Sequence, residues 1–281
     1  MKSNRIASTA LVVLFCFASI SRGDPPPTPA AKLEALKKEY DDAMAAYRKA
    51  VEPLPETPEG EKKADELWKE FDKKQSDLFL AAVELAKADP KSDTALAALE
   101  WVLTIPRSYY LPAGKPAMEL AAEHHAANPK IGKIVAWIGY YGPHEQNKQG
   151  AWQEAEHLLK TVLEKNPDRA VRGQVVITEA WRAKGRFAAA EFKRSPDTDA
   201  LAKDAEKAFE TVLKDYGDCP RLIRDNAGTL GNRAKQELNE LRNLRIGKVA
   251  QEIEGEDLDG KKFKLSDYRG KVVMLDFWGH W

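Results

Sequence analysis

Cysteine is scarce in this chain of 281 residues, which carries only Cys16 and Cys219. Two thiols cannot form the disulfide framework that stabilises small secreted domains. An excess of charge of one sign is also missing, because 44 Lys and Arg residues balance 44 Asp and Glu residues. This balance excludes a strongly basic nucleic-acid-binding protein and an acidic disordered tail. We therefore expect no nucleic-acid partner.

Long hydrophobic runs are missing as well. The apolar run at residues 10–18 is shorter than the roughly 20 residues that a membrane-spanning helix needs. Lys2 and Arg5 precede this run, and small residues stand at Ser21 and Gly23, just before Asp24. This order of charged, apolar and small residues predicts a cleaved signal peptide over residues 1–23. We expect an exported protein with no stable membrane span, in preference to an uncleaved N-terminal anchor or a lipoprotein.

Residue patterns typical of metal or nucleotide sites are lacking too. His124 and His125 are adjacent, and neighbouring residues on a helix point about 100° apart, so the two rings do not converge on one ion. The stretch 139–142 has two glycines but lacks the lysine of a phosphate-binding loop. We expect no metal and no cofactor. After removal of the signal peptide Cys219 is the remaining thiol, and we interpret it as buried and inert.

Helical periodicity is what the chain has in abundance. Residues 24–29 form a proline-rich linker, and Thr28 with Pro29 predicts the start of a helix. Thr57 and Pro58 predict the start of a second helix, antiparallel to the first. The apolar residues of the first helix recur at intervals of three and four: Leu33, Leu36, Tyr40, Met44, Tyr47 and Val51. Each helix therefore has one apolar face.

A repeat of about 38 residues follows. Helix-ending Asx-Pro pairs begin at residues 89, 128 and 166, which are 39 and 38 residues apart. Residues 154–163 also resemble residues 204–213. Two-helix units at this period are typical of a solenoid related to tetratricopeptide repeats (TPR), and an irregular helical bundle is an equally weighted alternative. We predict a helical, TPR-like domain over residues 30–245, which could bind a protein ligand, with a helix across 171–177 that ends near Lys184.

The last 36 residues, 246–281, change character. Residues 251–254 are a short candidate strand, Asp259-Gly260 is typical of a hairpin turn, and residues 262–265 form the second strand. Residues 266–270 are interpreted as a helical turn that ends at a glycine. Residues 271–278 are predicted to form a strand that is buried on both faces, with Asp276 as a buried acid inside it.

These elements carry motifs that succeed one another in a specific order. They are Ile246-Gly-Lys-Val-Ala250, Asp257-Leu-Asp-Gly-Lys261, Phe263-Lys-Leu-Ser-Asp-Tyr-Arg-Gly-Lys-Val-Val273 and Leu275-Asp-Phe-Trp-Gly-His-Trp281. Together they resemble the opening of a TlpA-type thioredoxin-like (redoxin) domain. The expected fold is then mainly α, a helical-hairpin array followed by the first β elements of an incomplete thioredoxin-like α/β domain.

The resemblance implies roles for a few residues. Asp276 matches the carboxylate that relays protons behind the active-site disulfide, and Trp278 and Trp281 match the aromatic residues that line it. In that family a Cys-x-x-Cys pair follows the position of Trp281, where this sequence ends. The chain as given lacks those cysteines, so we expect it to be inactive, although a complete domain would be a thiol–disulfide oxidoreductase.

The family resemblance also implies partners and a location. A complete domain would act on protein thiols and disulfides together with a redox partner protein, in the periplasm or cell envelope of a bacterium, and would serve cell redox homeostasis. Two alternatives remain open. One is a helical protein-binding scaffold with a redoxin appendage, and the other is a peroxidase of the peroxiredoxin type, whose Pro-x-x-x-Thr-x-x-Cys loop the sequence does not show.

Overall fold

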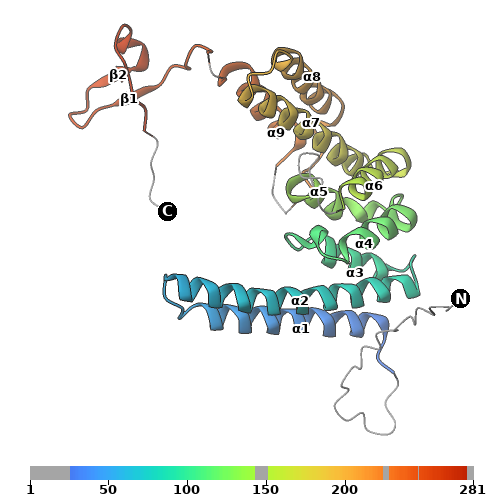
Figure 1. Ribbon diagram of the computed structural model, residues 1–281. Coiled ribbons are helices and arrows are strands. Elements are labelled where there is room, and N and C mark those ends of the chain that lie inside the picture. Colours follow the sequence, from blue (N-terminus) through green and yellow to red (C-terminus); the bar gives the residue numbers. More distant parts are fainter. Residues whose placement is uncertain (1–25, 143–150, 224–227, 246, 277–281) are drawn as a thin grey trace, which may run out of the picture.

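The computed structural model describes residues 26–142, 151–223, 228–245 and 247–276. The described chain is mostly helical and has a small two-stranded antiparallel sheet near its C-terminal end (Figure 1). The predicted signal peptide, 1–23, lies outside the described residues. The α-helices and strands of the described residues are α1 (Pro29–Val51), α2 (Pro58–Ala88), α3 (Asp93–Leu103), α4 (Gly114–Leu120), α5 (Gly132–Tyr141), α6 (Trp152–Lys165), α7 (Arg169–Phe192), α8 (Thr198–Tyr216), α9 (Leu230–Asn243), β1 (Glu254–Glu256) and β2 (Lys262–Lys264).

The starts of the first two helices follow from their capping residues. The Oγ1 of Thr28 accepts the N–H of Ala31 at 3.2 Å, and the Oγ1 of Thr57 accepts the N–H of Gly60 at the same distance. A proline in the first turn of each helix costs no hydrogen bond, because the N–H at that position has no partner within the helix. Both predicted starts are therefore confirmed. The Asx-Pro pairs also act as expected, since α2 ends one residue before Asp89 and α6 one residue before Asn166.

One predicted boundary is wrong. We expected the helix through 171–177 to end near Lys184, but α7 continues to Phe192. A single glycine at 185 lowers helix propensity without ending a helix. Phe187 and Ala190 lie beyond it and are buried, so the packed face of the helix continues past the glycine.

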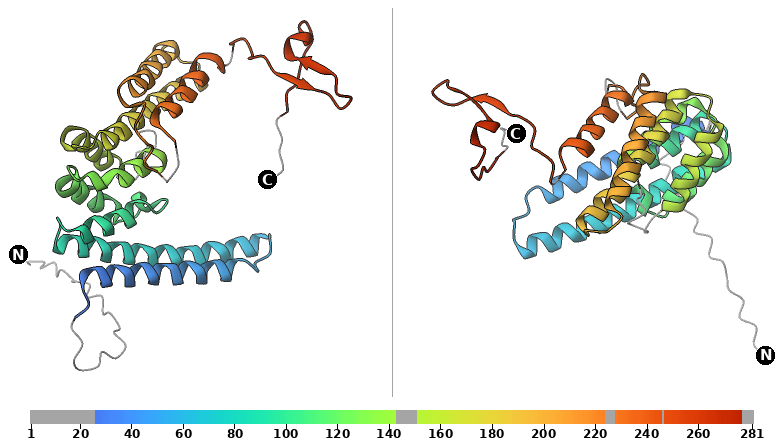
Figure 2. Two further views of the ribbon diagram at one scale, coloured as in Figure 1. Left: turned by 180° about the vertical axis from the view of Figure 1, so that it is seen from behind. Right: turned by 90° about the horizontal axis from the view of Figure 1, so that it is seen from above.

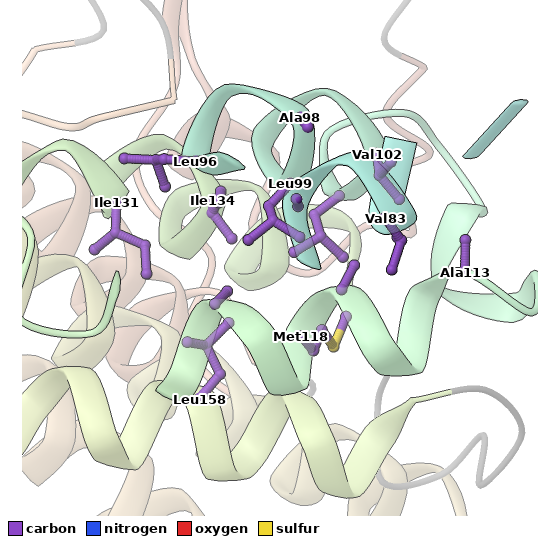
Figure 3. Packing of buried hydrophobic residues seen from close by; sticks show 14 of the residues in the cluster. Val83, Leu96, Ala98, Leu99, Val102, Ala113, Met118, Ile131, Ile134 and Leu158 are labelled. Carbon is purple, nitrogen blue, oxygen red and sulfur yellow. The ribbon is translucent and has the colours of Figure 1, made fainter. Parts of the chain in front are cut away.

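The helices pack in sequence order. In Figures 1 and 2, α1 and α2 lie side by side and antiparallel, and the later helices stack on them one after another. The larger buried cluster joins α1–α7, and Figure 3 shows Leu99, Met118, Ile134 and Leu158 converging in it from four helices. A second cluster, around Phe209 and Leu230, joins α7, α8 and α9.

The two similar segments of sequence bury equivalent positions. Ala155, Leu159 and Val162 are buried in α6, and the residues 50 positions later are buried in α8. Those residues are Ala205, Phe209 and Val212. The similarity between 154–163 and 204–213 therefore reflects a shared packing face. Of the described helices, none is long and apolar enough to cross a membrane.

A π-helical segment, η2 (Ala121–His125), interrupts the stack between α4 and α5 and ends at a buried histidine. His125 is 1% exposed, and its Nε2 has no hydrogen-bond partner. Burial lowers the pKa of His125, an effect that a hydrogen bond to the Pro90 backbone partly opposes. The neutral ring is therefore the form that fits the folded chain.

We expect this histidine to make folding sensitive to mild acid. Its folded pKa lies below the unfolded value of about 6.5, so the unfolded chain binds more protons and stability falls as pH drops below that value. The loss is at most about 1.4 kcal/mol per pH unit. Urea unfolding at pH 7.5 and 5.5 should show a smaller loss for His125→Gln than for wild type. His124→Gln is the matched control, and an unchanged loss in His125→Gln would contradict the assignment.

Candidate functional site

The motifs of the C-terminal segment fold as a hairpin with a tight turn. Glu254 pairs with Lys264, and Glu256 with Lys262, in antiparallel register. Asp257 organises the turn, because its Oδ1 accepts the N–H of Asp259 at 3.0 Å and that of Lys261 at 2.9 Å. Gly260 has φ +76°, a conformation that glycine adopts without steric cost. The predicted hairpin at Asp259-Gly260 is thus confirmed.

The first strand differs from its predicted position. We expected it at 251–254, but β1 spans Glu254–Glu256. The turn takes up the five residues 257–261, so the residue that pairs with Lys262 at the start of β2 is Glu256. Gln251 lies before the strand and its side chain instead donates to Asn239 Oδ1 of α9 at 3.1 Å. On one face of the hairpin Phe263 lies against Gly255, where an added Cβ would come within 3.1 Å of the ring.

Charged side chains hold the exposed hairpin together. The Lys264 ammonium lies 2.5 Å from the Glu254 carboxylate across the two strands, and this contact raises the pKa of Lys264. The N–H of Ser266 donates to Glu252 Oε1 at 2.9 Å, and bonding to Ser266 lowers the pKa of Glu252. The lysine and the two glutamates are solvent-exposed. Their arrangement is structural.

A 3-10 turn, η4 (Leu265–Tyr268), follows β2 and leads to the region of the predicted site. Asp267 Oδ2 accepts the N–H of Lys264 at 2.9 Å, and Gly270 has φ +82°. The expected helical turn ending at a glycine is thus confirmed. The chain then runs from Lys271 to Asp276 without secondary structure.

The prediction of a buried strand at 271–278 is wrong for the described residues 271–276. They pair with no strand, and Val272 and Met274 are more than 90% exposed. Asp276 is exposed as well, not buried. A strand that is apolar on both faces needs neighbouring strands and covering helices, and the described chain places none there. Trp278 and Trp281 lie outside the described residues, so the structure does not bring the three predicted site residues together.

The thiol at Cys219 is buried, as predicted. Burial raises the pKa of Cys219, which disfavours the thiolate that nucleophilic chemistry requires. Within the described ranges no group of three His, Cys, Asp or Glu residues could hold a metal ion. Gln174 and Glu237 are buried polar residues that no motif in the sequence marks. Their one signal is that each is a polar residue on the apolar face of its helix, α7 or α9.

Three relatives with the same name are similar to a short part of this chain. Thiol-disulfide oxidoreductase ResA of Bacillus cereus and that of Bacillus anthracis are each 50% identical over 38 residues, which cover 14% of this chain and 22% of the relative. The protein of that name from Geobacillus thermodenitrificans is 47% identical over 36 residues, 13% of this chain and 21% of the relative. No family model matches the chain. No solved structure matches it.

The chain thus spans about a fifth of the length of the curated relatives that it matches. This partial similarity points to a thioredoxin-like relationship of a short part of the chain.

Proposed function

We propose that the segment 246–281 is the opening of a TlpA-type thioredoxin-like domain and that the protein serves thiol–disulfide exchange. The observation that carries the proposal is 50% identity to thiol–disulfide oxidoreductases over 38 residues, a stretch about as long as this segment. The hairpin between β1 and β2 and the turn that ends at Gly270 agree with the order of the family's motifs. In a complete domain Asp276 would relay protons, and Trp278 and Trp281 would line the cysteine pair.

The chemistry of such a domain needs residues that this chain does not carry. Exchange requires a thiolate at a helix N-terminus and a second cysteine that resolves the mixed disulfide. Cys219 has no second cysteine near it in sequence, and its buried thiol has a raised pKa. The relatives continue for about four fifths of their length outside the matched stretch. We propose that the catalytic cysteines, and the surface that binds the protein partners of the reaction, belong to such a continuation.

We expect no disulfide reductase activity from the 281-residue chain. The assay is reduction of insulin by dithiothreitol, and its control is Cys219→Ser, which removes the buried thiol. Both proteins should give the uncatalysed rate. Turnover by wild type that Cys219→Ser abolishes would overturn the assignment of the chemistry to residues beyond this chain.

Export is a further part of the proposal. It is supported by the charged, apolar and small residues of 1–23, and it would place the protein in the periplasm or cell envelope. N-terminal sequencing of protein from a cell-envelope fraction should begin near Asp24. An intact Met1 in cytosolic material would contradict export.

For the helical part we propose a TPR-like array that binds a protein ligand. The equivalent burial of residues in α6 and α8, 50 positions apart, favours this array over an irregular bundle. If no redox domain completes the chain, protein binding by the array would be its main activity. The peroxidase alternative receives no support from the described residues, because it needs a single cysteine after a threonine in a loop that this chain does not show.

A further inference from the structure

The segment between α8 and α9 does not simply connect them, because part of it lies against α5 and α7. In Figure 1 the described residues of this segment, coloured orange, lie beside α5. The N–H of Leu222 donates to Gln174 Oε1 on α7 at 3.3 Å, and the Leu222 side chain is half-buried against the larger hydrophobic cluster. Leu222 lies near Gly132, Val171 and Gln174, and Arg221 lies over Tyr140. We call these four residues, Gly132, Tyr140, Val171 and Gln174, the Leu222 seat.

The seat has room for a leucine because α5 begins with a glycine. A Cβ at Gly132 would lie 2.6 Å from Leu222 Cδ1 and 3.2 Å from Val171 Cγ2. Any larger residue at 132 would therefore displace the Leu222 side chain. The space beside the first turn of α5 thus accommodates an aliphatic side chain.

The residue before the leucine is selected as well. The Arg221 guanidinium lies over the Tyr140 ring, with Cζ 5.3 Å from the ring centroid. Tyr140 in turn packs edge-on against Trp181 of α7, with ring centroids 4.6 Å apart. A cation over an aromatic face is attracted by the negative potential of the ring. The seat therefore favours a basic residue followed by an aliphatic residue.

The segment that occupies the seat, residues 220–223, satisfies only one of the two polar groups of the Gln174 carboxamide. The residue is fully buried, and its Nε2 has no hydrogen-bond partner although its Oε1 accepts the N–H of Leu222. A glutamine carboxamide can pair with both the N–H and the C=O of one residue in an extended chain. The segment cannot adjust freely to do so, because Arg221 donates its N–H to Gly228 and Pro220 bridges Thr229.

We propose that the Leu222 seat is a binding site for an extended segment of a partner protein in which arginine precedes leucine or another aliphatic residue. Residues 220–223 of this chain occupy the site in the absence of that partner. A partner segment that supplies both an N–H and a C=O to Gln174 would displace them. The inference rests on the proposed protein-binding role of the helical array.

The test uses a fluorescein-labelled peptide, Pro-Arg-Leu-Ile, which has the sequence of residues 220–223. In wild type the resident segment competes at an effective concentration on the order of millimolar. Leu222→Ala empties the seat of its leucine, so fluorescence anisotropy should show the peptide binding this variant at least tenfold more tightly than wild type. A peptide with glutamate in place of arginine should bind at least tenfold more weakly.

Three variants act as controls for the position of binding. Gly132→Ala combined with Leu222→Ala narrows the seat and should weaken binding, as should Gln174→Met combined with Leu222→Ala. Leu163→Ala removes a partly exposed leucine from α6 and should leave binding as weak as in wild type. Wild type titrated into the millimolar range should still saturate, which tests the proposal even where Leu222→Ala does not fold.

Three results would overturn the proposal. They are absence of binding to a folded Leu222→Ala variant, equal binding when Gly132 is also replaced, and absence of saturation with wild type. Sedimentation tests the other occupant: a wild-type dimer that the peptide dissociates would mean that the seat receives a second copy of this chain. None of these results depends on cysteine chemistry, so this inference and the redox proposal fail separately.

Discussion

Phe79→Ala is expected to destabilise the helical part of the chain by about 3–5 kcal/mol, the usual cost of deleting a fully buried aromatic ring. Phe79 on α2 is 0% exposed. Its ring stacks on Tyr40 of α1 with centroids 5.7 Å apart and meets Trp101 of α3 edge-on at 5.2 Å. One side chain thus joins the first three helices, and its removal leaves a cavity that none of them can close alone.

Phe192→Ala is the matched control, because it makes the same change at the end of α7, where the side chain is 91% exposed. We expect its stability to stay within about 0.5 kcal/mol of wild type, as is usual for surface positions. Denaturant unfolding monitored by circular dichroism measures both variants. Equal effects of the two substitutions would mean that α1–α3 do not pack as described.

Glu237→Gln is expected to lower the free energy of unfolding by about 3 kcal/mol, since it removes the charge of one partner in a buried ionic network. Glu237 is 1% exposed. It accepts a hydrogen bond from Trp181 Nε1 at 2.8 Å and lies 2.5 Å from both Lys184 Nζ and Arg233 Nη2. Without its charge, Arg233 loses the carboxylate that it pairs with, and Lys184 is left with the exposed Glu240.

The same network predicts a pH dependence. Burial alone would raise the pKa of Glu237, but hydrogen bonds from Lys184 and Trp181 outweigh it and hold the pKa below its usual value of 4.5. A carboxyl group with a lowered folded pKa stabilises the fold above its unfolded pKa, and that stability is lost as the pH falls below about 4.5. Glu237→Gln should therefore lose less stability than wild type between pH 5 and pH 3.

Glu240→Gln is the control for this network, because Glu240 also pairs with Lys184 but is exposed. Its effect should stay below about 1 kcal/mol, as for most exposed ion pairs. Urea unfolding at pH 7, pH 5 and pH 3 gives both the cost of each substitution and the pH dependence. A loss in Glu240→Gln as large as that in Glu237→Gln would contradict the buried network.

Much of the local structure could be predicted because it depends on neighbouring residues. Thr28 and Thr57 cap helices through bonds that span three residues, and Asp257 with Gly260 closes the hairpin within five. Such contacts leave a direct pattern in the sequence. The Asx-Pro breaks near 89 and 166 belong to the same class.

The remainder depended on contacts that the sequence pattern does not specify. The apolar run 272–275 predicts burial, but burial needs covering elements, and the described chain supplies none, so Asp276 is exposed. Glu237 is the opposite case, since it is a charged residue that is buried. The sequence pattern does not indicate that this charged residue is buried, because its burial comes from the packing of α7 against α9.

Peptide mass spectrometry of the protein isolated from its source cells tests the central claim most directly. The claim is that 246–281 opens a thioredoxin-like domain whose catalytic cysteines follow Trp281. The account predicts peptides that contain residues 272–281 and continue into a Cys-x-x-Cys pair. A native C-terminus at Trp281, or a continuation without that cysteine pair, would contradict it.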